Sequence, residues 1–587
     1  MNSETKTHSQ SSVSENCQNC KKDFVIEPDD FGFYEKMKVP APTFCPDCRL
    51  QRRFMFRNNR SFYKRECQLC GKSMLALYHK DRPFTVYCRE CWLSDKWDPM
   101  SYEQDYDTSK PFLEQFRSLQ LVVPRSNMYQ TNFISSEYCN YGLDFKECYL
   151  TFGGHNNERV FFANQTFDCK DSLDVAFSEK TEFSYELFEC ERTNKLFFSH
   201  HSVDCLDSYY LADCRNCMNC FGCVGLVNKQ YHVFNQPYSK EEYGKFIEEY
   251  EGSYKKYLEF LKKFKELELT LPHRYARIYK SLSSDGDDLA EVKNTHMSFT
   301  SRQAEDCSFL FLCRSNSKFC YDNTFQGFGA ELLYEITSGF GGANTAFGVR
   351  NIYNQNSFYN EECHDCSNIF GCEGLRKKSY CILNKQYSKE EYEKLIPQII
   401  KHMGEMPYID KKERIYRYGE FFPSEFCPFS YNETAVQEYF PLTKEEALNQ
   451  GYSWLDGEVR NYKIDIETSD LPDKIQEVGE EIVNKVINCE HTGKCKHQCT
   501  EAFKIVPEEF KFYKRMNLPL PRLCPNCRHY QRINLRNPLK LWDRVCMCDK
   551  TSYFHENEKC VVEFKTSYAP ERSEIIYCEK CYQQEIY

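Results

Sequence analysis

Pairs of cysteines separated by two residues are concentrated near the N-terminus of this 587-residue chain, where four such pairs fall within residues 17–91. A tight turn brings the two sulfurs of such a pair to one side, so two pairs can surround one ion. Zinc favours four thiolates in a closed tetrahedron, which stabilises a fold and leaves no open position for catalysis. Redox dithiols and unligated core cysteines are the alternatives. We expect up to four structural Zn²⁺ ions as the cofactors.

Two metal sites in series are predicted at each end of the chain. The predicted ligands are Cys17, Cys20, Cys45 and Cys48; Cys67, Cys70, Cys88 and Cys91; Cys495, Cys499, Cys524 and Cys527; and Cys546, Cys560, Cys578 and Cys581. In the C-terminal copy, Cys489 and His491 are alternative ligands of the first site, and Cys548 and His555 of the second.

The two ends are copies of one module. They align without a gap at an offset of 479 residues from Phe24/Phe503 to Cys67/Cys546, and an insertion of 11 residues then restores the match. Pro46 and Pro525 follow the first cysteine of a pair, where a helix can begin without losing a needed N–H. A cysteine turn whose partner pair opens a helix is typical of treble-clef and zinc-ribbon modules.

Basic residues follow the second cysteine pair in both copies. Those predicted to bind nucleic acid are Arg49, Arg52, Arg53, Arg57, Arg60, Arg528, Arg532 and Arg536. Clustered cations with nearby aromatic residues suit phosphate contacts and base stacking, so RNA or DNA is the first partner considered. The alternative is that these arginines neutralise the thiolates or dock on an acidic part of the same chain, in which case the protein is a protein-interaction scaffold.

The charge distribution is compatible with either reading. Residues 17–97 carry 16 Lys and Arg against 10 Asp and Glu, and residues 489–587 carry 17 against 13. With a net charge of −11 for the whole chain, the remaining residues carry −21. Two basic ends therefore flank an acidic centre.

The centre repeats an acidic residue followed by cysteine. Glu147-Cys148, Asp168-Cys169 and Glu189-Cys190 are 21 residues apart, and later intervals are shorter. A period near twenty with short aromatic and aliphatic stretches predicts stacked coils, in which like residues lie above one another. We expect a β-solenoid whose cysteines are mostly internal.

The solenoid is itself duplicated. Residues 214–226 correspond to 363–375 at an offset of 149, and the match continues into YSKEEY at 238–243 and 387–392. Ser239 and Ser388, each followed three residues later by glutamate, form capping boxes that predict helices over 239–266 and 388–404. The run Cys214, Cys217, Cys220, Cys223 could hold an iron–sulfur cluster, but buried core positions are the favoured interpretation, because Ile369 replaces the third cysteine in the second copy.

The expected fold is therefore multidomain and mainly β, with a duplicated β-solenoid-like centre flanked by two duplicated zinc-ribbon or treble-clef modules. The predicted segments are a disordered tail over 1–16, a double zinc module over 17–97, solenoid halves with helical ends over 125–280 and 300–416, a helical connector over 417–488, and a second double zinc module over 489–587.

Enzyme signatures are missing from the sequence. There is no Walker-type Gly-rich Lys motif, no His-Glu-x-x-His and no strand–Gly-x-Gly-x-x-Gly–helix unit. The glycine-rich stretch at 339–348 reads as a solenoid turn. No secretory signal and no apolar run long enough to span a bilayer is visible, so a cytoplasmic, non-membrane protein is expected. We expect a binding protein, with an enzyme as the less favoured class.

The phrases FYEKMKVPAP, PLTKEEALNQGYSW and TSYAPERSEIIYCEKCYQQEIY resemble a family of large cysteine-rich bacterial proteins with terminal zinc modules. The resemblance covers both end modules and the connector, and it implies bound zinc. Members sometimes carry a CaiB/BaiF coenzyme A-transferase label, which implies a Rossmann-like interlocked dimer with an aspartyl nucleophile. The internal repeats, the Cys-x-x-Cys modules and the low glycine content argue against that label. A carbohydrate-active solenoid is the other enzyme alternative.

Overall fold

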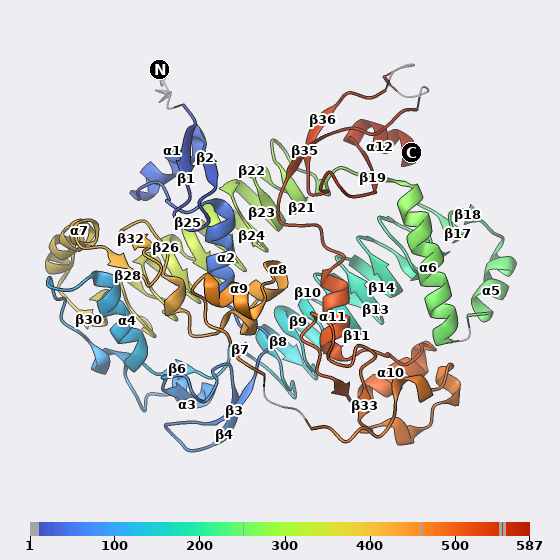
Figure 1. The fold of residues 1–587 in the computed structure, drawn as a ribbon, viewed down its shortest axis with the longest axis horizontal. Coiled ribbons are helices and arrows are strands. Elements are labelled where there is room, and N and C mark those ends of the chain that lie inside the picture. The colour runs from blue at the N-terminus through green and yellow to red at the C-terminus, as the bar shows by residue number, and fades with distance from the viewer. Residues whose placement is uncertain (1–10, 251, 458–460, 551–553, 556–558, 587) are drawn as a thin grey trace. The chain divides into compact units, whose positions relative to one another are not determined.

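The computed structural model describes the whole chain except residues 1–10, 251, 458–460, 551–553, 556–558 and 587 (Figure 1). The fold is mainly β and multidomain, with two parallel β-solenoids and several cysteine clusters, which confirms the expected fold class. The chain forms two compact units, each of which is discontinuous in sequence. Unit 1 comprises Met1–Met128 with Ala276–Asp456, and unit 2 comprises Tyr129–Tyr275 with Gly457–Tyr587. The N-terminal module thus shares a unit with the second solenoid, and the C-terminal module with the first.

The solenoid of unit 2 is a stack of parallel strands (Figure 1). Its strands are β7 (Gln130–Thr131), β8 (Asn140–Lys146), β9 (Phe152–Phe161), β10 (Asn164–Phe167), β11 (Lys170–Ala176), β12 (Glu179–Glu182), β13 (Tyr185–Phe188), β14 (Glu191–His200), β15 (Leu206–Tyr209), β16 (Met218–Phe221) and β17 (Gln230–Val233). Residues of successive coils pair twelve positions apart, as in Asn140 with Phe152 and Leu173 with Tyr185.

A three-residue period builds each coil. From Asn132 to Phe234 every third residue has a left-handed backbone, glycines included. Most of these residues are followed by one whose side chain points into the coil, as Glu186 is followed by the buried Leu187. Four such triplets make one turn of twelve residues. A left-handed conformation costs about 1–2 kcal/mol for an ordinary residue, so the hydrogen bonds between coils must offset this cost.

Polar side chains inside the coils form hydrogen bonds with the backbone. Ser178 donates through Oγ to the carbonyl of Ala176 (3.0 Å) and accepts from the backbone N–H of Cys190 one coil later (3.1 Å). The Cys190 thiol in turn donates to the carbonyls of Phe188 and Ser199 (3.5 and 3.6 Å). Small Cys, Ser, Thr and Asn side chains therefore fill a narrow interior without leaving backbone groups unpaired.

The coil length corrects the period expected from the sequence. The acidic–cysteine pairs at 147–148, 168–169 and 189–190 are 21 residues apart, which is seven triplets rather than one coil. The acidic residue occupies the left-handed corner, a conformation that Asp and Asn tolerate well, and the cysteine is the interior residue that follows. The acidic–cysteine pattern thus shows which residue of each triplet is the corner and which is interior. It carries no information on the number of triplets in a turn.

The solenoid of unit 1 repeats this design with two insertions. Its strands are β20 (Ile278–Tyr279), β21 (Gly286–Ala290), β22 (Lys293–His296), β23 (Ser298–Ser308), β24 (Arg314–Thr324), β25 (Ala330–Thr337), β26 (Ala343–Val349), β27 (Gln355–Phe358), β28 (Ser367–Phe370) and β29 (Ser379–Ile382). Consecutive left-handed residues at 315–316 and 328–329 each add one residue, so Ala304 pairs with Ser317, thirteen positions away. The Gly341–Gly342 turn belongs to this solenoid.

A hairpin and a helix close the C-terminal end of each solenoid. The antiparallel strands β18 (Gln236–Pro237) and β30 (Lys385–Gln386) pair with the last parallel strands. The helices α5 (Lys240–Glu248), α6 (Tyr254–Thr270) and α7 (Lys389–Glu405) follow. The capping boxes of Ser239 and Ser388 are confirmed. The closure covers strand edges that would otherwise be free to pair with another chain.

The terminal modules consist of short hairpins and helices. The N-terminal module contains β1 (Val13–Asn16), β2 (Asp23–Ile26), α1 (Pro28–Met37), α2 (Pro46–Met55), β3 (Tyr63–Glu66), β4 (Ser73–Ala76), β5 (Val86–Tyr87) and α3 (Arg89–Leu93), and a linking segment adds η1 (Pro99–Tyr102), α4 (Phe112–Val122) and β6 (Arg125–Ser126). The C-terminal module contains β33 (Ile487–Asn488), β34 (Ala502–Phe503), α10 (Pro507–Met516), α11 (Pro525–Ile533), β35 (Trp542–Val545), β36 (Glu563–Thr566), β37 (Ile575–Tyr577) and α12 (Glu579–Ile586), and β37 pairs with β19 (Pro272–Arg274).

The structure differs from the prediction in two segments, the N-terminal tail and the connector. The expected tail over 1–16 lies outside the described residues up to residue 10, and β1 begins at Val13 because it pairs with β2. The expected connector over 417–488 is divided between the two units after residue 456. Its helices are short: η2 (Ser424–Phe426), η3 (Tyr431–Glu433), α8 (Val436–Tyr439), α9 (Lys444–Asn449), η4 (Thr468–Asp470), η5 (Ile475–Glu477) and η6 (Glu480–Ile482). A hairpin of β31 (Tyr408–Ile409) and β32 (Ile415–Tyr416) precedes them. None of the helices in the described residues is both long and apolar enough to cross a bilayer.

The triplet assignment predicts different costs for two leucines of the same solenoid. Replacing the interior residue, Leu187→Ala, should lower the free energy of unfolding by about 2–5 kcal/mol, because a cavity is left in a tightly packed core. Leu206 is 41% exposed, and Leu206→Ala should change the free energy of unfolding by less than about 0.5 kcal/mol. Denaturant unfolding followed by circular dichroism measures both, and equal effects would contradict the assignment.

Candidate metal centres

Four cysteines of the N-terminal module converge at the junction of a hairpin and a helix. Cys17 and Cys20 lie in the turn between β1 and β2, Cys45 is the N-cap of α2, and Cys48 lies in its first turn. Their sulfurs lie within 4.8 Å of one another, and Cys20 Sγ is 3.7 Å from Cys45 Sγ. A tetrahedral zinc with bonds of about 2.3 Å requires sulfur–sulfur edges of about 3.8 Å. The geometry suits such an ion.

The same arrangement recurs in the second half of the module. Cys67 and Cys70 occupy the turn between β3 and β4, and Cys88 and Cys91 open α3. Cys70 Sγ lies 3.9 Å from Cys88 Sγ, and all four sulfurs are mutually within 4.8 Å. Hairpin, turn and helix N-terminus together form a treble clef in each half.

The C-terminal module brings Cys546, Cys560, Cys578 and Cys581 together in the same way, with α12 following Cys578. Cys560 Sγ is 3.9 Å from Cys578 Sγ. Of the two alternative ligands, Cys548 is buried in the same cluster, and the His555 ring packs edge-on against Phe554.

The remaining site differs from the ligand set expected from the sequence. Cys489, Cys499, Cys524 and Cys527 form the tetrad, so Cys489 takes the place predicted for Cys495. The reason is positional, because Cys489 directly follows β33, as Cys17 follows β1. Cys495 instead belongs to a neighbouring group with His491, His497 and Cys527.

One sulfur in each of the four tetrads accepts a hydrogen bond from a backbone N–H group. The N–H groups of Cys45, Cys88, Cys524 and Cys578 donate to the first hairpin sulfur at 3.2, 3.2, 3.3 and 3.2 Å. Each donor is the residue at which the helix begins, so the helix N-terminus stabilises negative charge on that sulfur. Although burial opposes it, backbone N–H groups of Cys88, Cys70 and Leu69 lower the pKa of Cys67 to about 6, whereas burial raises the pKa of Cys546 to about 11. Hydrogen bonds from Cys45 and Cys48 hold the pKa of Cys17 far below its ordinary value.

The solenoid cysteines have a different environment. Burial raises the pKa of Cys148 to about 11 and of Cys190 to about 12. The four cysteines at 214, 217, 220 and 223 are buried in one apolar cluster, and their thiols donate to backbone carbonyls at 3.3–3.6 Å. These contacts fit interior residues of one coil.

The arginines of α2, the helix that begins at the first tetrad, form ion pairs with carboxylates of the solenoid in unit 1. Arg49 Nε and Arg53 Nη1 each lie 3.0 Å from an oxygen of Asp322, and Arg53 Nη1 lies 2.9 Å from Glu335. Arg52 pairs with Glu335 and with Glu420 at 3.1 and 3.4 Å. All of these side chains are buried. Asp322 and Glu335 occupy left-handed corners of successive coils, and Glu420 follows the solenoid in the sequence.

Unit 2 contains the same junction. Arg528 and Arg532 on α11 lie 3.0 and 2.7 Å from Asp174, and Arg532 lies 3.4 Å from Glu186. Arg528 also contacts Glu509 at 3.2 Å. Three acids face two arginines here, and burial raises the pKa of Glu186 to about 7 against the attraction of Arg532.

The partners of these arginines were not identified from the sequence. Glu186 and Glu335 are 149 residues apart, which is the offset of the solenoid copies, whereas Asp174 and Asp322 are 148 apart because the residue added at 328–329 lies between Asp322 and Glu335. A search for acidic residues that recur within one residue of this offset would have found both pairs.

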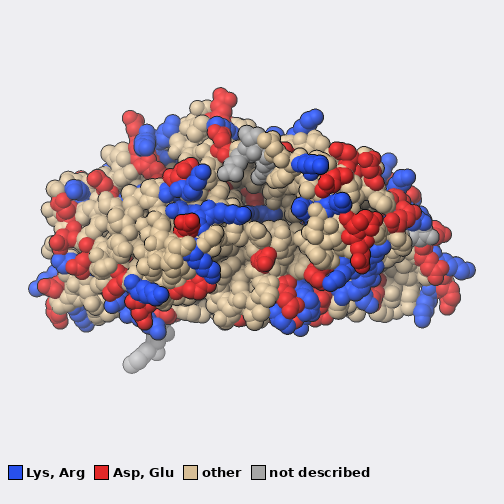
Figure 2. Space-filling view, turned by 90° about the horizontal axis from the view of Figure 1, so that it is seen from below, with Lys and Arg blue, Asp and Glu red and all other residues tan. Residues whose placement is uncertain are grey.

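The arginines predicted to bind nucleic acid are therefore largely interior. Arg49, Arg52, Arg53, Arg57, Arg528 and Arg532 are no more than 4% exposed, and Arg60 and Arg536 are partly buried. Arg57 donates to Ser338 Oγ at 2.9 Å and its guanidinium lies 4.0 Å from the Phe325 ring centroid. Nucleic-acid binding through these residues stays a prediction that requires the ion pairs to open. Figure 2 shows basic and acidic side chains interspersed on the face it presents.

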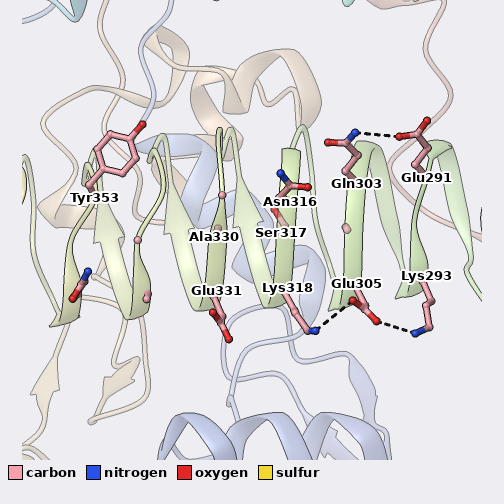
Figure 3. Close-up of a pocket in the computed structure, with 15 residues that line it drawn as sticks. Glu291, Lys293, Gln303, Glu305, Asn316, Ser317, Lys318, Ala330, Glu331 and Tyr353 are labelled. Carbon is pink, nitrogen blue, oxygen red and sulfur yellow. Dashed lines mark hydrogen bonds and ion pairs between the residues drawn. The ribbon is translucent and has the colours of Figure 1, made fainter.

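The solenoid of unit 1 carries a trough of about 850 Å³ on its outer face. Its floor is formed by the strand backbone at Ala304, Ser317, Ala330 and Ala343, at the coils that contain the insertions. Figure 3 shows two rows of longer side chains along its edges. One row joins Lys293, Glu305 and Lys318 through contacts of 2.8 and 3.4 Å, and the other joins Gln303 to Glu291 at 3.1 Å.

Comparisons with known proteins give no family. No protein-family model matches the chain, and no curated protein matches it. Among solved structures, one described as a "putative acetyltransferase" from Desulfovibrio desulfuricans G20 matches 49% of this chain and 86% of that chain at 9% identity, with a TM-score of 0.10. A likeness at that score carries no argument on fold or function.

Metal content should separate the tetrad cysteines from the solenoid cysteines. Cys48→Ser removes one thiolate of a tetrad and should release one ion per chain while lowering the temperature of unfolding, because ion binding is coupled to folding of the module. Cys220→Ser, at a buried solenoid position, should leave the metal count unchanged. Elemental analysis of the purified proteins measures both, and loss of metal from the Cys220 variant would contradict the distinction.

Breaking the buried junction should cost far more than breaking a surface pair. Arg53→Met leaves Asp322 and Glu335 buried with one cation fewer and should lower the free energy of unfolding by about 3–5 kcal/mol. Arg192 pairs with Asp204 at the surface, where the two side chains are 45% and 42% exposed. Arg192→Met should cost at most about 1 kcal/mol. Denaturant unfolding compares the two, and similar losses would refute the structural role of Arg53.

Proposed function

We propose that this protein is a non-catalytic binding scaffold in which four structural zinc ions hold the terminal modules against the two solenoids. The observation that carries the proposal is the closed tetrad at each hairpin–helix junction, since four cysteines leave no ligand position for a substrate or a catalytic water. The helices that begin at Cys45 and Cys524 then supply the arginines of both buried junctions.

The ligand surface that we propose is the trough of unit 1. Its floor of strand backbone lets an extended segment approach the solenoid closely, and its edges present charges of both signs from Glu291 to Glu331. Mixed charges along a groove give specificity for a complementary partner more than raw affinity. We therefore favour an extended segment of a protein partner over nucleic acid, whose phosphates would meet Glu291, Glu305 and Glu331 as well as the two lysines.

RNA or DNA bound by the terminal modules is the competing function. It draws support from the basic composition of both modules, and it requires exposed cations, because affinity for nucleic acid comes mainly from phosphate neutralisation. The buried ion pairs of Arg53 and Arg528 weigh against it. A cytoplasmic location is part of the proposal, since the many thiols of this chain persist best in a reducing compartment.

Charge reversal in the trough tests the proposed function. Tagged full-length protein purified after nuclease treatment should retain the same partner polypeptide, and Lys318→Glu combined with Glu331→Lys should abolish its capture because the order of charges on the edge is inverted. Lys263→Glu, on the exposed part of α6, serves as the control and should capture the partner normally. Capture that disappears with nuclease, together with nucleic-acid affinity that falls steeply with salt, would replace this proposal with the competing one.

A further inference from the structure

A second group of donor atoms adjoins the tetrad of Cys489, Cys499, Cys524 and Cys527. His491, Cys495 and His497 lie in the loop between β33 and β34, and one donor atom from each lies within 4.8 Å of the others and of Cys527 Sγ. Cys495 Sγ is 3.6 Å from Cys527 Sγ, and Cys489 Sγ is 3.9 Å from the same atom. Cys527 therefore belongs to both groups.

The loop that carries these donors is specific to the C-terminal copy. Two residues separate Cys17 from Cys20, whereas nine separate Cys489 from Cys499, and all three additional donors fall among those nine. Left-handed residues at Thr492, Gly493 and Gln498 fold the loop back on itself. The insertion does not disturb the tetrad, so its donors are additional to the four cysteines and do not replace them.

Both histidines present a buried ring nitrogen without a hydrogen-bond partner. Nδ1 of His491 and Nδ1 of His497 are inaccessible to solvent and unpaired among the residues that the structure describes. The His497 ring stacks on Tyr530, with centroids 5.4 Å apart and planes 5° from parallel, and the two imidazoles are 5.4 Å apart. Buried ring nitrogens normally have a hydrogen-bond partner or bind a metal. Two unpaired imidazole nitrogens beside two thiols therefore indicate a site for a cation.

We propose that His491, Cys495, His497 and Cys527 bind a second divalent ion, with the Cys527 thiolate bridging it to the ion of the tetrad. A thiolate sulfur has enough lone pairs to bind two metals, and two imidazoles with two thiolates form a tetrahedral set suited to Zn²⁺. Three of these four residues are half-buried, whereas three of the four tetrad cysteines are buried. The second ion therefore exchanges with solvent before the first.

Cadmium-113 NMR of the full-length protein tests the site, with Cd²⁺ as the probe. Five resonances are expected, four in the range of all-sulfur coordination and one shifted towards mixed nitrogen and sulfur coordination. The fifth should show metal–metal coupling to one of the four, because Cys527 joins the two ions. Four uncoupled all-sulfur resonances would overturn the proposal.

Variants identify the ligands independently of the spectrum. His491→Gln with His497→Gln should lower the zinc content from five ions to four and leave the temperature of unfolding within the range of the wild type, and His232→Gln on the solenoid should retain five. Cys495→Ser should remove the same single ion. If Cys495→Ser instead alters an all-sulfur resonance while the histidine variants keep the wild-type count, Cys495 belongs to the tetrad and the second ion does not exist.

Release kinetics provide a readout in the unmodified protein. A weak chelator should remove one of the five zinc ions in a distinct fast phase, and this phase should be missing from the double histidine variant. Zinc release in a single phase that is identical in both proteins would also overturn the proposal.

Discussion

The buried pairing of helix arginines with solenoid carboxylates is the interaction on which the arrangement of each unit depends. Arg49 and Arg53 are one helical repeat apart, which places them about 6 Å apart along α2. Asp322 and Glu335 lie on successive coils, about 4.8 Å apart. The two spacings match closely enough for Arg53 to contact both acids. Pairs of this kind add little net stability over apolar packing, so their value lies in fixing one docking position for the module. The cysteine tetrads contribute because Cys45 and Cys524 are the residues at which the two helices begin.

The duplication of this junction explains the organisation of the chain. Arg49 and Arg53 correspond to Arg528 and Arg532 at the module offset of 479. Asp322 and Glu335 correspond to Asp174 and Glu186 at offsets of 148 and 149. A module and a solenoid therefore form one repeated unit. Along the chain the order is module, solenoid, solenoid, module, and each module docks on the solenoid more distant from it in sequence. Duplication preserved the charged contact although the connections between its parts changed.

Local spacing in the sequence was enough to predict the cysteine turns, the helices that start at Pro46 and Pro525, and the capping boxes of Ser239 and Ser388. The coil length was not predictable from the cysteines, because their intervals report the triplet and not the turn. Cys489 was predicted only as an alternative to Cys495, because the loop insertion displaced the alignment of the first cysteine pair. The partners of the arginines could not be predicted from composition, since 273 residues separate Arg49 from Asp322, and neither residue carries a local signal of the other.

The separation of each module from its solenoid has a consequence for biosynthesis. When the N-terminal module leaves the ribosome, the carboxylates that neutralise Arg49 lie 273 residues further along the message. At a translation rate of about 5–20 residues per second, the nascent chain carries an unpaired basic helix for roughly 14–55 seconds. Early folding of that module must rely on its own buried side chains and on the ions proposed for its cysteine tetrads. On the zinc binding proposed above, cellular zinc supply during translation would then influence how much of the newly made polypeptide reaches its mature form.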